Sequence, residues 1–233
     1  LVLNIFLMSV IFQIIGFISF LFFWDQKIVG NDYGIVFNAL FHSISAFNGA
    51  GFDILIDNHG GSVGVISYDS AILNITMILI VLGSIGYPFI LELFANARLF
   101  IQSKYKDIFF TLNFKVIIFG TTIIMILGAL QFLFSEWTNL ATIGNVSIKE
   151  KIIHSIFHSI TRTAGFSLLD YNSIHNSTSI TTIALMFIGG SSLSVAGGIK
   201  IGTLSIITVS LISTIIGKEE VVLFKRTVNR DII

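Results

Sequence analysis

Apolar residues along this chain form long runs separated by short polar stretches, and the run lengths predict its elements. Residues 1–24, 71–95 and 112–134 are long enough, at about 1.5 Å of rise per helical residue, to cross a bilayer core of about 30 Å. Residues 34–47 and 148–161 are apolar but too short to span, which is typical of half-helices that enter a membrane and turn back. Residues 180–217 are apolar again but are interrupted by glycines and serines.

At the end of each half-helix stands a turn that finishes in the same three residues, Ala-Gly-Phe. The first copy is Ser45-Ala-Phe-Asn-Gly-Ala-Gly-Phe52 and the second is Ser159-Ile-Thr-Arg-Thr-Ala-Gly-Phe166. An offset of 114 residues relates the two phenylalanines, and it also carries Trp24 onto Thr138 and the glycine cluster 83–86 onto 197–200. We therefore predict an all-α membrane protein made of tandem repeats, each with a helix, a pore loop and a helix.

The predicted repeats divide the chain in two. The first, 1–110, holds the span 1–24, the half-helix with its turn at 34–52, and the span 71–95. The second, 111–233, holds the span 112–134, the half-helix with its turn at 148–166, a broken span at 180–217 and a charged tail at 218–233 that is expected to be cytosolic. Pro88 lacks a backbone donor, so a kink is expected in the span 71–95.

Composition supports a multi-pass membrane protein. Hydrophobic residues make up 54% of the chain, charged residues 11%, and the mean hydropathy is +0.92. There is no cysteine, which excludes disulfides and thiolate metal sites in this chain, and a net charge of zero gives no reason to expect a nucleic-acid partner. The apolar run begins at Leu1 without a polar leader, so we expect no signal peptide and treat the chain as a fragment.

Basic residues near the ends of the runs indicate the orientation. Four of them lie between residues 96 and 115, and four lie in the tail, whereas the stretch 25–70 has only Lys27. We therefore place the 96–115 loop and the tail in the cytoplasm, and both turns on the outer side of a bacterial cell membrane.

The two turns are candidate ion ligands, because a dehydrated potassium ion requires oxygens that replace its hydration shell. Glycine permits a positive φ, so that successive carbonyls can face one way, and the negative end of a half-helix dipole favours a cation. The predicted backbone ligands are Asn48, Gly49, Ala50, Gly51, Arg162, Thr163, Ala164 and Gly165. The alternative is that each Ala-Gly-Phe is only a small-residue contact between helices.

These motifs resemble the second and third pore loops of the Trk/Ktr/HKT superfamily of potassium transporters, and bacterial Ktr and Trk membrane subunits in particular. Leu82-Gly-Ser-Ile-Gly-Tyr-Pro88 and Phe187-Ile-Gly-Gly-Ser-Ser-Leu-Ser-Val-Ala-Gly-Gly-Ile-Lys200 resemble the inner helices of the same two repeats. The resemblance implies potassium uptake through a filter of four repeats, of which this chain would hold two. It also implies a homodimer, a cytosolic nucleotide-binding regulatory subunit of the RCK type, and no cofactor in this chain beyond the transported potassium.

Glycines and serines at 189–200 cannot form a stiff helix, since each glycine costs about 1 kcal/mol relative to alanine. In the family such a loop lies beneath the filter and blocks the pore, so the resemblance implies a gate. The predicted gate residues are Gly189, Gly190, Ser191, Ser192, Ser194, Gly197, Gly198 and Lys200. Three residues depart from the family pattern: Gly49 stands where it often has Asn, and Leu193 and Val195 where it tends to have Gly and Thr.

The 189–200 loop and Arg162 each allow a second interpretation. A nucleotide-binding P-loop is rejected because Ile199 separates Gly198 from Lys200, whereas a close helix-packing stripe stays open. Arg162 either supports the filter or extends to the outer interface.

Two alternatives from other functional classes stay open at this point. His42 and His158 are interpreted as packing residues, although an intramembrane protease or lipid-modifying enzyme would need such a histidine beside a serine or carboxylate. The other alternative is a non-conducting structural fragment. Lys225 and Arg226 in the tail are candidates for contact with a partner or lipid headgroups.

Overall fold

The computed structural model describes residues 2–24, 34–54, 70–217, 221–224 and 226–228. The predicted polar stretches at 25–33 and 55–69, and much of the charged tail including Lys225, lie outside the described residues. The elements, in chain order, are α1 (Val2–Phe23), α2 (Gly34–Asn48), α3 (Ser70–Ile85), α4 (Tyr87–Ile101), η2 (Tyr105–Asp107), α5 (Leu112–Glu136), α6 (Ile148–Thr161), η3 (Tyr171–Ser173), α7 (Asn176–Met186), α8 (Ile201–Ile215), β1 (Val221–Leu223) and β2 (Arg226–Val228).

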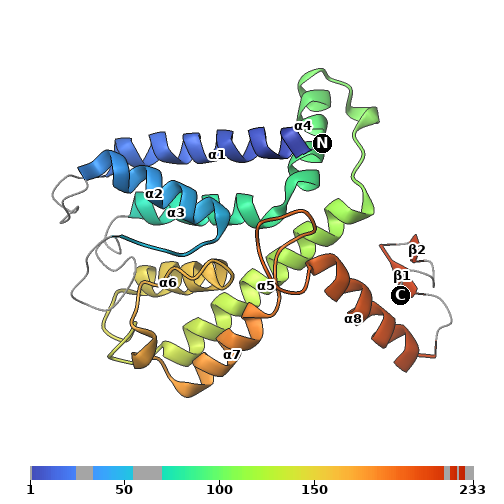
Figure 1. Ribbon diagram of the computed structural model, residues 1–233. Helices are drawn as coiled ribbons and strands as arrows, with labels where there is room; N and C mark the ends of the chain where they lie inside the picture. Colours follow the sequence, from blue (N-terminus) through green and yellow to red (C-terminus); the bar gives the residue numbers. More distant parts are fainter. Residues whose placement is uncertain (1, 25–33, 55–69, 218–220, 225, 229–233) are drawn as a thin grey trace.

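In each predicted repeat the half-helix packs against the helix that precedes it. In the first, α2 packs against both α1 and α3, and in the second, α6 packs on α5 (Figure 1). The two repeats meet where α6 contacts α3, and one buried cluster joins them, with Phe20 from α1, Leu79 from α3 and Phe157 from α6. The prediction of an all-helical membrane fold is confirmed. The half-helices therefore share one core, which places their C-terminal turns side by side.

Both inner helices are broken. The predicted span 71–95 is two helices, α3 and α4, bent by 101° at Gly86, and α4 continues to Ile101. Glu92 fixes the new direction by accepting hydrogen bonds from the backbone N–H and the hydroxyl of Thr111, at 2.6 and 2.7 Å. The second inner helix is interrupted between α7 and α8, as the glycines and serines there indicate.

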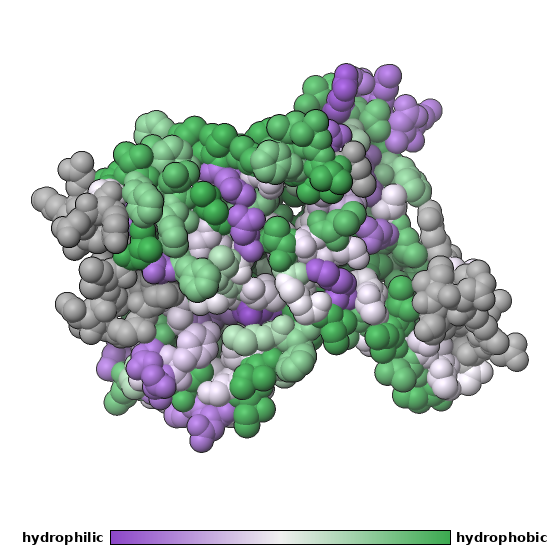
Figure 2. Space-filling view, in the orientation of Figure 1, coloured by the Kyte–Doolittle hydropathy of each residue, from purple (hydrophilic) through white to green (hydrophobic). Residues whose placement is uncertain are grey.

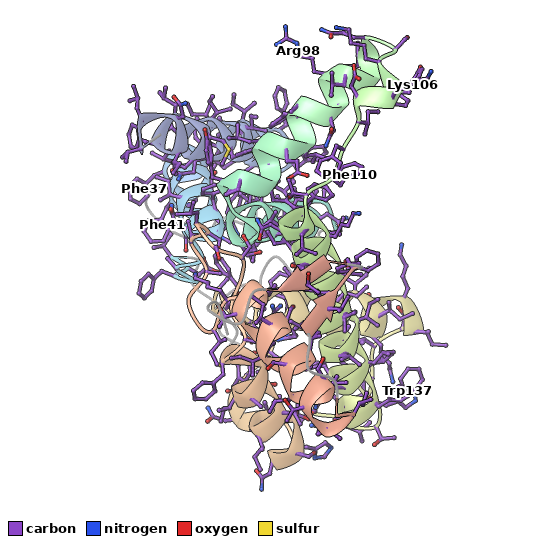
Figure 3. All side chains as sticks on the ribbon, turned by 90° about the vertical axis from the view of Figure 1, so that its right-hand side faces the viewer. Phe37, Phe41, Arg98, Lys106, Phe110 and Trp137 are labelled. Carbon is purple, nitrogen blue, oxygen red and sulfur yellow. The ribbon has the colours of Figure 1, made fainter. Side chains whose placement is uncertain are left out.

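Two helices of the described part of the chain, α1 and α5, are long and apolar enough to cross a bilayer, and the bent pair α3–α4 makes a third if it counts as one span. Apolar side chains cover the outer face of α1, and hydrophilic ones gather at the tip that follows α4 (Figure 2). Arg98 and Lys106 project from that tip, far from Trp137 at the end of α5 (Figure 3). This distribution fits a chain embedded in lipid with a charged tip outside it.

The half-helix α6 begins with a reciprocal cap. The Ser147 hydroxyl accepts the backbone N–H of Glu150 at 3.3 Å, and the Glu150 carboxylate accepts the backbone N–H of Ser147 at 2.9 Å. The two bonds satisfy backbone donors that a helix start leaves free, which fixes where the half-helix enters.

A buried carboxylate at the end of α5 holds this part of the second repeat together. Glu136 is fully buried, and its oxygens accept hydrogen bonds from the side chains of Asn139 and Thr142, the backbone N–H of His175, and the hydroxyl of Thr178. These donors come from both the loop before α6 and the start of α7. Glu136 therefore ties α5 to the entry and exit of the second pore loop.

The described part of the tail folds back instead of leaving the helices at once. Strands β1 and β2 pair antiparallel, with Val222 opposite Thr227. Phe224 at their turn lies against Phe119 of α5, with 5.4 Å between ring centroids. The prediction of a charged exit segment missed this contact, because it depends on α5 being adjacent.

Candidate ion pathway

The first turn, residues 48–52, leaves α2 through a left-handed residue, Gly49, with φ of 62°. The backbone N–H of Gly49 donates to the carbonyl of Ala46 at 3.3 Å, and that of Ala50 donates to the carbonyl of Ser45 at 2.9 Å. This pair of bonds is the Schellman motif that glycine favours at helix ends. It turns the N–H groups back toward the helix and leaves the carbonyls of the turn facing away from it.

The second turn, residues 162–166, has different bonds. The backbone N–H groups of Ala164 and Gly165 both donate to the carbonyl of Thr161, at 2.8 and 2.9 Å. Gly165 is the left-handed residue here, with φ of 86°. As in the first turn, the N–H groups point to the helix end.

The two turns lie against each other. A side-chain carbon added to Gly51, whose φ is 70°, would collide with the carbonyl oxygen of Ala164, and one added to Gly49 would lie 3.7 Å from the carbonyl oxygen of Thr163. A carbon added to Gly165 would lie 3.7 Å from the Cα atom of Gly51. The structure thus brings together the backbone segments that the sequence predicts as ion ligands.

The carbonyl oxygens of these segments are left without donors. Within the described residues, no N–H or O–H group donates to the carbonyls of residues 48–51 or 162–165. Buried backbone carbonyls find partners almost without exception, and an unpaired one in a membrane costs several kcal/mol. Asn48, Ala50 and Gly165 are exposed, so this cluster of carbonyls is open to water or a cation.

The next carbonyl in each turn is held by a hydroxyl from its own half-helix. Ser45 donates to the carbonyl of Phe52 at 2.7 Å, and Thr161 donates to the carbonyl of Phe166 at 3.0 Å. These bonds fix the peptide group that follows each phenylalanine, one residue beyond the left-handed glycine. Neither hydroxyl was predicted to contact the turns. Both lie in the last turn of a half-helix, so such a contact could have been expected from the sequence.

Each half-helix is also attached to the helix that precedes it in the chain, which we call its outer helix (α1 for α2, α5 for α6). In both cases a serine on the half-helix lies opposite a glycine on the outer helix. The Ser43 hydroxyl donates to the carbonyl of Gln13 at 2.5 Å, beside Gly16, and a side-chain carbon on Gly16 would lie 2.6 Å from that hydroxyl. In the second repeat, Ser159 donates to the carbonyl of Met125 at 2.6 Å, beside Gly128. The repetition of this contact is independent structural evidence for an internal repeat.

Arg162 points inward and not to the outer interface. It is 6% exposed, and its guanidinium donates to the carbonyl of Ser159 at 3.1 Å and to the carbonyl of Gly189 at 3.5 Å. The side chain thus joins the end of α6 to the start of the 189–200 loop. The outer-interface interpretation of this residue is not supported.

The 189–200 loop is closed at its base and lies against the break between α3 and α4. Two backbone hydrogen bonds close its base: the N–H of Gly189 donates to the carbonyl of Ile199 at 3.0 Å, and the N–H of Ile199 donates to the carbonyl of Phe187 at 2.8 Å. The Lys200 ammonium donates to the carbonyl of Ala196 at 2.6 Å. The other predicted gate residues of the loop lie between these bonds.

The whole chain matches a known protein family. All of its residues, 1–233, match the TrkH family, which is described as a cation transport protein. The chain belongs to the TrkH family.

Curated relatives agree with this TrkH-family assignment. The chain is 36% identical over 199 residues to the Ktr system potassium uptake protein B of Bacillus subtilis, a match that covers 85% of the chain and 42% of the relative. It is 31% identical over 223 residues to the potassium/sodium uptake protein NtpJ of Enterococcus hirae, with 95% and 46% covered. The chain therefore spans less than half the length of the relatives that it matches.

The crystal structure of the potassium transporter TrkH from Vibrio parahaemolyticus has the same fold. The TM-score is 0.64 at 19% identity, over 93% of this chain and 43% of that one. The family assignment and the fold place the chain in the bacterial plasma membrane as part of a transport protein, and they give no support to the intramembrane enzyme.

The two half-helix histidines of this TrkH-family chain are packing residues in the structure. His42 lies between Phe20 and Phe166, with 5.0 Å between ring centroids in both cases, and its Nε2 pairs with Thr76 at 3.0 Å. His158 stacks on Phe132 at 4.6 Å. The described residues contain no group of three His, Cys, Asp or Glu that could hold a metal ion.

Proposed function

We propose that this chain supplies two of the four quarters of a potassium-selective filter in a bacterial potassium uptake protein. The ligands are the backbone carbonyls of residues 48–51 and 162–165. Two further repeats in the full-length protein complete the ring, and transport is passive permeation through these oxygens.

The carbonyls without internal donors carry this proposal. They belong to two turns in direct contact, at the ends of half-helices whose dipoles favour a cation. Carbonyl rings that replace the hydration shell are the way in which proteins select potassium. The relatives named as potassium uptake proteins support the choice of ion, and the one named as a potassium/sodium uptake protein makes sodium the competitor to test.

The 189–200 loop acts as the gate of this pathway. It lies in the second inner helix, and Arg162 links its first residues to the second turn. The full-length protein is a homodimer that works with a cytosolic nucleotide-binding subunit, as the resemblance to Ktr and Trk systems implies. Deletion of residues 191–196 should raise potassium flux in liposomes without loss of folding, and an unaltered flux would remove the gate role.

The filter is tested in the full-length protein by growth of a potassium-uptake-deficient strain at low potassium. The double variant Gly51→Ala/Gly165→Ala should abolish growth, because both glycines have a positive φ in the turns. Gly34→Ala is the matched control, since Gly34 has φ of 73° at the start of α2 but open space around it. Normal growth of the double variant at wild-type protein levels would contradict the filter.

A further inference from the structure

The break between α3 and α4 leaves backbone groups without their helical partners. Pro88 has no N–H, so the carbonyl of Ser84 has no donor four residues on. The N–H of Tyr87, which would donate to Gly83 in a continuous helix, donates instead to the carbonyl of Leu193 in the loop, at 3.2 Å. At membrane depth, such freed carbonyls need donors from elsewhere in the protein.

The 189–200 loop supplies one donor for each of three carbonyls at the break. The N–H of Val195 donates to Gly83 at 3.1 Å, and the N–H of Ser191 donates to Ser84 at 2.9 Å. The Ser191 hydroxyl donates to the carbonyl of Ile85. Three consecutive carbonyls of one repeat are therefore satisfied by the loop of the other repeat.

Glycines on both sides allow this close approach. A side-chain carbon on Gly86, which has φ of 87°, would collide with the Ser191 hydroxyl and lie 2.7 Å from the carbonyl of Ser192. One on Gly190 would collide with the carbonyl of Ser84. Ser191 itself is fully buried, whereas its neighbour Ser192 is exposed.

The loop also has bonds of its own that do not involve the α3–α4 break. Its base is closed by its own backbone bonds, and Ser194 donates to the carbonyl of Ser191 at 2.6 Å inside the loop. The bonds to the α3–α4 break are separate from these. If the loop moves away, the carbonyls of Gly83, Ser84 and Ile85 lose these donors together, so they need other partners, through a change of the bend in α3–α4 or from water.

We infer that the α3–α4 break is the seat of the gate loop and that Ser191 is the positioning residue that holds the loop closed. The inference rests on the proposed function, since it assigns the gate's closed position and the event that opens it. Opening then requires α4 to move or its freed carbonyls to meet water. The closed position of the loop therefore depends on the break between α3 and α4, and the carbonyls at that break depend on the loop.

The test is potassium flux through the full-length protein in liposomes, without activating partners. Ser191→Ala removes the Ile85 bond and leaves a buried carbonyl without a donor, so resting flux should rise about tenfold. Ser19→Ala is the control: it also removes a hydroxyl that donates to a backbone carbonyl, that of Ile15 within α1, and it should leave flux unchanged. A merely structural defect would lower flux or blur selectivity, whereas an unseated gate raises flux and keeps the potassium-to-sodium ratio.

A second variant, Pro88→Ala, changes the same contact on the side of the α3–α4 break. Pro88→Ala gives the chain an N–H that can donate to Ser84 in place of Ser191, so it should also raise resting flux. Because both changes act on one contact, the flux of the double variant should fall clearly below the product of the two single effects. Independent multiplication of the effects would overturn the shared seat.

The outcomes separate this inference from the filter. If Ser191→Ala and Pro88→Ala both leave resting flux at the wild-type level or lower it, the seat is wrong. If that happens while Gly51→Ala still abolishes selective flux, only the seat fails. If Gly51→Ala leaves selective flux intact, the filter fails instead.

Discussion

After α2 the chain leaves the helix through Gly49 in a Schellman motif and becomes left-handed again at Gly51, whereas after α6 the first left-handed residue is Gly165. The two turns therefore reach the same Ala-Gly-Phe ending by different backbone paths. They share the left-handed glycine and the hydroxyl that holds the following phenylalanine carbonyl. These shared features are what a carbonyl-lined turn needs, and the rest is open to variation.

The surroundings of the two glycines differ more than their dihedral angles. Gly51 is pressed against the backbone carbonyl of Ala164, but the nearest atom to a side chain on Gly165 would be 3.7 Å away. Glycine at 51 is thus required by both φ and space, and glycine at 165 by φ alone. A substitution at Gly51 should therefore have a larger effect than the same substitution at Gly165.

The largest effect is expected from Gly51→Ala. The new methyl group meets a backbone carbonyl that cannot move without displacing the second turn, and the positive φ adds strain. Together these should lower potassium uptake by at least about a hundredfold, since strained backbone alone costs about 1–3 kcal/mol. Uptake of labelled potassium by the full-length protein measures this, with protein level as the control.

Gly165→Ala should have a smaller effect on the same measurement. Only the left-handed backbone is penalised, at about 1–2 kcal/mol, which corresponds to a loss of about tenfold. An equal or larger loss than for Gly51→Ala would show that the space around Gly51 is not what distinguishes the two turns.

Local signals explain how much of this architecture could be read from the sequence. Run lengths and the Ser147–Glu150 cap mark α6, which extends from Ile148 to Thr161, and Pro88 marks the break between α3 and α4. The family assignment and the all-helical membrane fold that the motifs predict are confirmed.

Contacts between distant segments could not be predicted in the same way. The angle of 101° at Gly86 and the bond from Ser191 to Ile85, 106 residues away, depend on one repeat supplying donors to the other. The inward direction of Arg162 depends on where the loop lies. Leu193 shows the same limit: it has φ of 55°, which gives a physical reason for the glycine that the family tends to have there.

The hydroxyl contacts at the phenylalanine carbonyls also differ between the two turns. The hydrogen bond from Thr161 to the Phe166 carbonyl is buried, whereas the one from Ser45 to the Phe52 carbonyl is only partly buried. A buried hydrogen bond is worth more than one open to water, so Thr161→Val should reduce the potassium-to-sodium selectivity ratio about fivefold, and Ser45→Ala about twofold. Competition of sodium with potassium uptake measures both, and a larger effect at Ser45 would contradict the ranking.

The smallest difference is expected where the repeats use the same contact. Ser43 and Ser159 each donate to a carbonyl of the outer helix beside a glycine, at 2.5 and 2.6 Å, and both are almost fully buried. Each serine-to-alanine change should cost about 1 kcal/mol, which lowers a melting midpoint by about 2–4 °C for a domain of this size. Thermal unfolding of the full-length protein in detergent compares them, and a shift at one serine several times that at the other would mean that the shared geometry does not carry a shared energy. Because neither hydroxyl bonds to the turns, selectivity should stay at the wild-type value in both variants, which separates attachment of the half-helix from the shape of the filter.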